Sequence, residues 1–129
     1  RPAQYGRYLH YGKTTNATPT EIFMGVDERL LVAQDWAYAF RTLVTAYRAI
    51  SFEAAGYELK GVVKNHSGTV SIAGSVTKTV LAEDNAAWDV DVTADNTNKA
   101  LVIFVTGAGS NTFWHAVTEV SEVFSYAPF

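Results

Sequence analysis

Acidic residues at alternating positions are the feature of this sequence with the clearest potential for chemistry. Asp89, Asp91 and Asp95 fit the spacing of the early ligands in a calcium-binding loop. However, the sixth position of such a loop would be Ala94 instead of glycine, and the twelfth would be Ala100 instead of glutamate. The same spacing also places carboxylates in a row on the wet face of a strand. We therefore predict a strand here and no metal site.

The remaining reactive side chains do not form a recognisable catalytic pattern. His10, His66 and His115 stand too far apart in the sequence to place two imidazoles on one metal by a short motif. Ser110 follows a glycine, but no glycine stands two residues after it, so it is not a hydrolase nucleophile elbow. The sequence has no cysteine and no glycine-rich phosphate loop. We expect no catalytic residue and no cofactor, and we predict that the protein is not an enzyme.

Composition limits the class of protein further. The chain has 129 residues, of which 48% are hydrophobic and 18% are charged, which suits one domain with an apolar core. Its net charge of -3 is the wrong sign for neutralising phosphates, so a nucleic acid partner is not expected. No apolar run is long enough for a membrane-spanning helix, and membrane insertion is not expected either. Because the sequence does not begin with methionine, we expect a piece of a longer protein.

Alternation of apolar and polar residues predicts the strands that must carry any site. Residues 88–94 alternate strictly, which places Trp88, Val90 and Val92 on one buried face. A cluster of turn-forming residues follows, and then residues 101–106 form a continuous apolar run. This pattern predicts a hairpin whose second strand lies deeper in the sheet.

Other segments extend the same reading. Residues 36–50 carry aromatic and β-branched residues at both odd and even positions, which favours a long buried strand, although the alanines leave a helix as an alternative. Residues 57–63 and 69–72 form a second predicted hairpin. Trp36 and Trp114 fall on the apolar side of their strands and are predicted to join the core. About eight strands result, and we predict an all-β protein, an antiparallel β-sandwich or jelly roll.

Three tyrosines mark the N-terminal segment. Tyr5, Tyr8 and Tyr11 recur every third residue in a segment that is too short to bury them by itself. Aromatic side chains are enriched in contacts between proteins. We therefore divide the chain into an N-terminal arm, residues 1–13, and one β-sandwich domain, residues 14–129. The three tyrosines are predicted to contact another subunit.

A resemblance to a known group of proteins adds to this reading. The strings Gly-Ser-Val-Thr-Lys-Thr-Val at 74–80 and Ala-Glu-Asp-Asn-Ala-Ala-Trp-Asp-Val-Asp-Val-Thr-Ala-Asp at 82–95, with Trp-His-Ala-Val at 114–117, carry it. They resemble a β-rich module of structural proteins of tailed bacteriophages, found on tail fibres, tailspikes and head-fibre appendages. The resemblance covers roughly residues 14 to 123. It implies a non-catalytic role and transfers no functional residues.

Together these observations predict a bacteriophage virion structural protein, a tail-fibre-type domain on the virion surface that is assembled in the host cytoplasm. Its expected partners are other virion subunits and copies of itself in a homotrimer, with a host surface glycan or receptor as a further candidate. One alternative is a capsid decoration or head-fibre protein. A second alternative is a secreted carbohydrate-binding module, which would need at least two aromatic rings exposed on one face.

Overall fold

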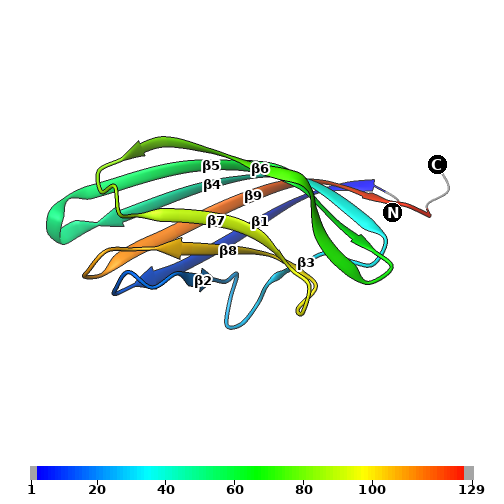
Figure 1. The fold of residues 1–129 in the computed structure, drawn as a ribbon, viewed down its shortest axis with the longest axis horizontal. Helices are drawn as coiled ribbons and strands as arrows, with labels where there is room; N and C mark the ends of the chain where they lie inside the picture. Colours follow the sequence, from blue (N-terminus) through cyan, green and yellow to red (C-terminus); the bar gives the residue numbers. More distant parts are fainter. Residues whose placement is uncertain (1–2, 127–129) are drawn as a thin grey trace.

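The computed structural model describes residues 3–126, and strands make up most of them (Figure 1). The strands are β1 (Ala3–Thr14), β2 (Thr20–Ile22), β3 (Leu30–Leu31), β4 (Trp36–Arg48), β5 (Glu53–His66), β6 (Thr69–Glu83), β7 (Asp89–Asp95), β8 (Ala100–Thr106) and β9 (Thr112–Phe124). A short 3-10 helix, η1 (Ala49–Ser51), joins β4 to β5. The predicted all-β class is confirmed, with nine strands in place of about eight.

The strands form two antiparallel sheets that pack as layers. The larger sheet has the order β1-β9-β4-β5-β6. In the smaller sheet, β8 pairs with β7 along one edge and with both β2 and β3 along the other. One side of the sandwich is joined by a bridge at which the Tyr11 N–H donates to the Phe23 carbonyl oxygen at 3.0 Å. The smaller sheet covers only one face of the larger one (Figure 1).

The segment that the sequence analysis separated as an arm belongs to the larger sheet. Residues 3–14 form β1, which pairs with β9 from Ala3 opposite Val123 to Thr14 opposite Thr112. This pairing joins the two ends of the described chain, more than a hundred residues apart. A local reading of the sequence cannot detect such a contact.

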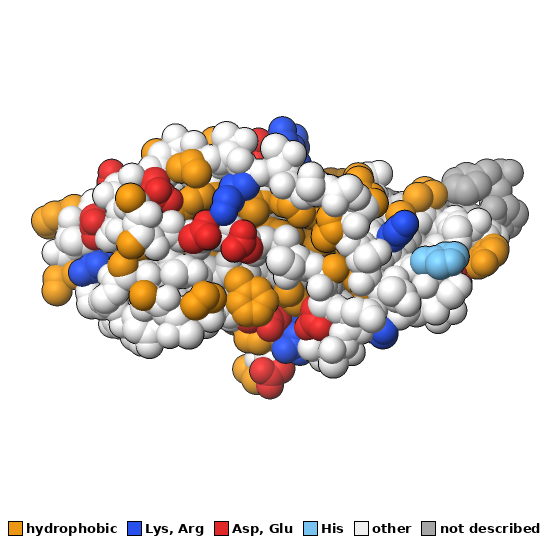
Figure 2. Space-filling model, viewed as in Figure 1, with side chains coloured by type: hydrophobic (Ala, Val, Ile, Leu, Met, Phe, Trp, Pro, Cys, Tyr) orange, Lys and Arg blue, Asp and Glu red, His pale blue; other side chains and the backbone are white. Residues whose placement is uncertain are grey.

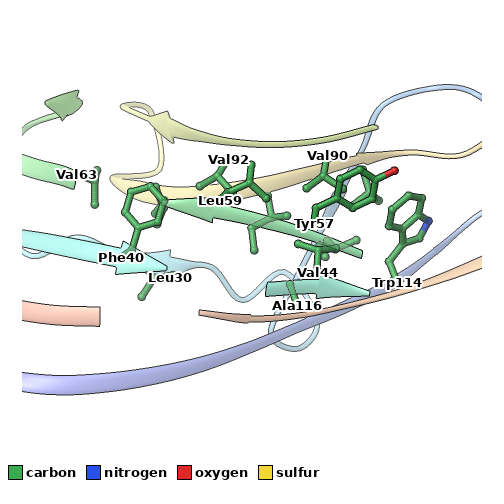
Figure 3. Close-up of a cluster of buried hydrophobic side chains, with 14 of the residues drawn as sticks. Leu30, Phe40, Val44, Tyr57, Leu59, Val63, Val90, Val92, Trp114 and Ala116 are labelled. Carbon is green, nitrogen blue, oxygen red and sulfur yellow. The ribbon is translucent and has the colours of Figure 1, made fainter. Parts of the chain in front are cut away.

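The core lies between the two sheets, where the larger one presents every second side chain. Figure 3 shows Phe40, Val44 and Leu59 from the larger sheet facing Val90 and Val92 from β7. Trp88 and Trp114 are also buried and meet edge to face, with ring centroids 5.9 Å apart. Trp36 is only half-buried and packs on Phe124, with the two ring centroids 5.5 Å apart.

A tight turn and a bulge give the hairpin of β5 and β6 its shape. Ser67 and Gly68 both have positive φ, 51° and 93°, as a tight two-residue hairpin turn requires. Gly74 has φ 72° and lies within a register shift of the β5–β6 pairing. An isolated glycine with positive φ inside a strand is typical of such a bulge or corner.

Candidate functional site

The face of the larger sheet that the smaller sheet leaves uncovered is the candidate site, and we call it the open face. It consists of the outward side chains of β1, β9, β4 and β5, which are the odd-numbered residues of the first three strands and the even-numbered residues of β5. The burial pattern of β4 shows the division, because its even positions from 38 to 46 are buried and its odd positions from 39 to 47 are exposed. Strand alternation alone produces this arrangement.

Aromatic rings gather at the end of the open face near η1. Phe113 lies directly opposite Tyr47 in the β9–β4 pairing. Tyr11 lies on β1, along the other edge of β9, two residues from the position opposite Phe113. The three side chains are 56%, 47% and 59% exposed. The next row contains Leu9 and Leu43, which are also exposed. Exposed rings and aliphatic side chains therefore continue from one row to the next.

The row of side chains beside Leu9 and Leu43 is charged and ordered by hydrogen bonds. Glu119 accepts from the Tyr5 hydroxyl at 2.8 Å and forms an ion pair with Arg41 at 2.9 Å. The guanidinium of Arg41, and then the hydroxyl of Tyr5, lower the pKa of the Glu119 carboxyl. Together with Lys60, these side chains line a shallow hollow over the sheet. The hollow therefore presents the ring of Tyr5 beside charged side chains.

Tyr8 lies on the opposite face of β1 from Tyr5 and Tyr11. Its hydroxyl donates to Glu122 at 2.8 Å, and the amide of Gln4 donates to the same carboxylate at 2.7 Å. Glu122 is 2% exposed, so these donors compensate for the lost hydration of its carboxylate. Burial, and then the bond to Glu122, raise the pKa of Tyr8. Tyr8 therefore faces the interior, whereas Tyr5 and Tyr11 are exposed on the open face.

The acidic residues of β7 lie against a lysine from β6. Lys78 binds Asp89 at 2.6 Å and approaches Asp91 at 3.5 Å. Asp95 instead accepts hydrogen bonds within its own turn, and the side-chain and backbone N–H groups of Asn98 lower its pKa. Within residues 3–126, no group of three or more potential ligands is placed to hold a metal.

The other candidates from the sequence do not meet at one place. His10 is buried on the inner face of β1, whereas His115 is exposed on the open face and His66 is exposed at the β5–β6 turn. Ser110 lies in the loop between β8 and β9. Over the described part of the chain, no helix combines the length and apolarity of a membrane span.

Sequence reasoning missed the residues that give the open face its character, chiefly Tyr47, Phe113, Leu9 and Leu43. A signal was present, because residues 36–50 are apolar at both odd and even positions. A strand of that kind is expected to be covered on both faces. In the structure β4 is covered on one face only.

Comparison with solved structures gives the class of fold. Over 95% of this chain, the tailspike protein gp49 of Acinetobacter baumannii bacteriophage Fri1, described as a capsular polysaccharide depolymerase, matches with a TM-score of 0.51 at 14% identity. The tailspike of Acinetobacter baumannii phage AM24 matches over 95% of this chain with a TM-score of 0.53 at 10% identity. No protein-family model and no curated protein matches the sequence.

These likenesses show that the chain has the fold of a β-rich module present in phage tailspikes. The matched regions are only 20% and 27% of the two tailspike chains, so the chain spans roughly a fifth to a quarter of their length. The resemblance noted in the sequence is therefore confirmed for the fold.

Proposed function

We propose that the chain is a non-catalytic structural domain of a bacteriophage tail appendage, displayed on the virion surface and assembled as a homotrimer. The open face is the observation that carries this proposal. Among residues 3–126, fifteen large hydrophobic side chains are exposed, and eight of them lie on the open face. They are Tyr5, Leu9, Tyr11, Leu43, Tyr47, Val62, Phe113 and Val123. Exposed apolar side chains that gather on one face of a protein often mark a contact with a partner.

The non-catalytic part of the proposal is supported by the partners of the titratable groups. The carboxylates of Glu119 and Glu122 on β9 accept hydrogen bonds from side chains of the neighbouring strand β1. Between β5 and β6, the hydroxyl of Tyr57 donates to Glu83 at 2.5 Å. Lys78 links β6 to β7 in the same way. These contacts join strands to one another, as expected of a domain whose charged groups stabilise its fold.

Light scattering on the purified chain tests the homotrimer. The expected particle mass is three times the chain mass of 14.1 kDa. A particle of one chain mass at micromolar concentration would contradict the proposal. Gold-labelled antibodies against the domain, applied to intact virions, would distinguish a tail position from the capsid decoration alternative.

A carbohydrate-binding module is the second candidate, and the aromatic end of the open face favours it. Tyr11, Tyr47 and Phe113 supply more than the two exposed rings that sugar stacking needs. The test is calorimetric titration with capsular polysaccharide, using Tyr47→Ala with Phe113→Ala and, as the control, Ile50→Ala. This candidate predicts a loss of affinity of about tenfold or more in the double variant alone. Absence of binding by the unmodified chain would exclude it.

A further inference from the structure

The turn between β4 and β5 holds an aromatic residue in a conformation that aromatic residues rarely adopt. Phe52, which follows η1, has φ 57° and ψ 24°, in the left-handed region where a Cβ atom crowds the backbone. The other non-glycine residues with positive φ in the described part of the chain are all polar, namely Asp27, Asp35, Ser67 and Lys99. Within residues 3–126, Phe52 is therefore the one apolar side chain placed under this strain.

Packing inside the domain does not explain why an aromatic ring stands at this position. The side chain of Phe52 is 82% exposed, and that of Ile50, in η1, is 79% exposed. We call these two side chains the apolar tip. Glycine would adopt the same backbone conformation without strain, and the core would lose little, because the ring is exposed. Backbone strain that the core does not need is typical of functional sites.

Hydrogen bonds hold the apolar tip in a fixed position. The Arg48 guanidinium donates to the carbonyl oxygen of Ala108 at 2.6 Å and lies 3.6 Å from Glu53, which also accepts from the Ser51 hydroxyl at 2.6 Å. The turn is thereby tied to the loop between β8 and β9. Residues 49–52 and 107–111 contain no charged side chain. Figure 2 shows apolar side chains gathered at this end of the molecule, where Figure 1 places the turn between β4 and β5.

Amphipathic side chains form the row directly behind the apolar tip. On the open face, Tyr47 of β4 lies opposite Phe113 of β9, which in turn lies opposite Lys13 of β1. All three are exposed. Tyrosine and lysine combine an apolar body with a polar end, which suits the boundary between water and lipid headgroups. Apolar side chains followed by such a row are the arrangement expected of a segment that lies at a membrane surface.

The size of the apolar tip favours a lipid over a protein as its partner. At roughly 150–250 Å² for each large side chain, the two side chains present clearly less than the 800 Å² or so that each partner buries in a stable protein complex. Binding to a membrane surface has no such threshold, because its strength grows with whatever apolar area enters the interface. A small protruding turn is therefore sufficient for a lipid contact.

The acidic side chains at the base of the turn limit the kind of bilayer. Glu53 is bound by Ser51, and Asp84 accepts from the backbone N–H of Ala54 at 2.9 Å, so both carboxylates lie close behind the apolar tip. Anionic lipids would repel them, whereas uncharged lipids such as phosphatidylcholine would not. An uncharged bilayer also excludes simple electrostatic attraction to the cations of the open face, such as Arg41 and Lys60.

We infer that the apolar tip docks on the surface of an uncharged lipid bilayer, with Ile50 and Phe52 among the headgroups and Tyr47 and Phe113 at the boundary with water. A contact of this kind lies on a membrane and does not span it. The tip stands at the opposite end of the sandwich from Ala3 (Figure 1). The inference is independent of the proposed homotrimer.

Flotation of the full chain with phosphatidylcholine vesicles, at about millimolar lipid, tests the inference. The variant I50S/F52G removes the apolar tip, and glycine accepts the φ of 57° at position 52. The matched control is V26S, because Val26 is also a branched aliphatic side chain, 92% exposed in the loop between β2 and β3. The melting temperature of each protein checks folding.

The unmodified chain and V26S should float with the vesicles, and I50S/F52G should show a lipid partition coefficient lower by about tenfold or more. The melting temperature of I50S/F52G should not fall, because glycine relieves the strain that Phe52 carries. The variant F52W keeps a large ring and should bind like the unmodified chain. Its added indole should shift its fluorescence to shorter wavelength when vesicles are present.

Other results would overturn the inference. If the unmodified chain does not float, or if I50S/F52G floats equally well, the apolar tip does not meet lipid. Flotation with anionic vesicles alone, abolished by added salt, would assign the binding to the cations of the open face. A lower particle mass of I50S/F52G in light scattering would assign the tip to a contact between copies. The particle mass of the unmodified chain tests the homotrimer separately, so a monomer that floats would contradict the homotrimer alone.

Discussion

His10 is a buried side chain whose protonation is coupled to folding at mildly acidic pH. It is 1% exposed on the inner face of β1, and burial lowers its pKa from 6.5 to about 4. The unfolded chain therefore binds a proton at a pH where the folded chain does not, so stability is lost as the pH falls from 6.5 towards 4. At about 1.4 kcal/mol per pH unit, the loss approaches roughly 3 kcal/mol.

Denaturant unfolding of the unmodified chain and of His10→Gln between pH 7 and pH 4 measures this effect. Carboxylates titrate in both proteins. The difference between their two slopes of unfolding free energy against pH therefore isolates the contribution of the histidine. The unmodified chain should show the steeper decline. Equal slopes would mean that position 10 accepts a proton in the folded state as easily as in the unfolded one.

Trp88 is a large buried side chain of the core on the side of the smaller sheet. It is 2% exposed and meets Trp114 edge to face. Trp88→Ala should lower the unfolding free energy by about 3–5 kcal/mol, because it leaves a large cavity between the sheets. Trp88→Phe is the control and should cost clearly less, since the indole N–H has no partner in the described structure. An unchanged melting temperature for the alanine variant would show that this side chain is not packed as described.

At the level of elements, β1 is an edge strand whose backbone groups point in two directions. The Tyr11 N–H donates away from β9, to Phe23. Because these directions alternate along a strand, the odd-numbered residues of β1 point to the free edge and the even-numbered ones point to β9. Amide exchange measured by NMR should therefore be slow at Tyr8 and fast at Arg7. Fast exchange at both positions would show a detached arm.

Local patterns predicted most of the strands but not how they assemble. Strict alternation placed Val90 and Val92 in the core, because in a half-buried strand the pattern itself records which face is covered. The tyrosines show the opposite case. Their spacing of three suggested one shared surface, yet a strand has a period of two, so Tyr8 faces away from Tyr5 and Tyr11.

The elements that the sequence could not predict depend on distant partners. β3 has two residues, too few for any period, and exists because it pairs with β8. The long extent of β1 likewise depends on β9 at the other end of the chain. The open face was missed for a related reason. Apolar residues at both odd and even positions of β4 indicate two covered faces, whereas only one face of β4 is covered in the structure.

For the molecule as a whole, we propose that another copy of this chain covers the open face. Leu43 lies in the middle of that face and is 44% exposed, whereas Ile50 is 79% exposed in η1, outside the face. Leu43→Glu and Ile50→Glu introduce the same charge on exposed aliphatic positions, so they form a matched pair. Burial of a charge without a partner should disrupt only the first.

Sedimentation equilibrium of the unmodified chain and these two variants, with their melting temperatures as the check on folding, is the most direct measurement. We expect three times the 14.1 kDa chain mass for the unmodified chain and for Ile50→Glu, and a folded monomer for Leu43→Glu. A monomeric unmodified chain, or a Leu43→Glu variant that still forms trimers, would contradict it.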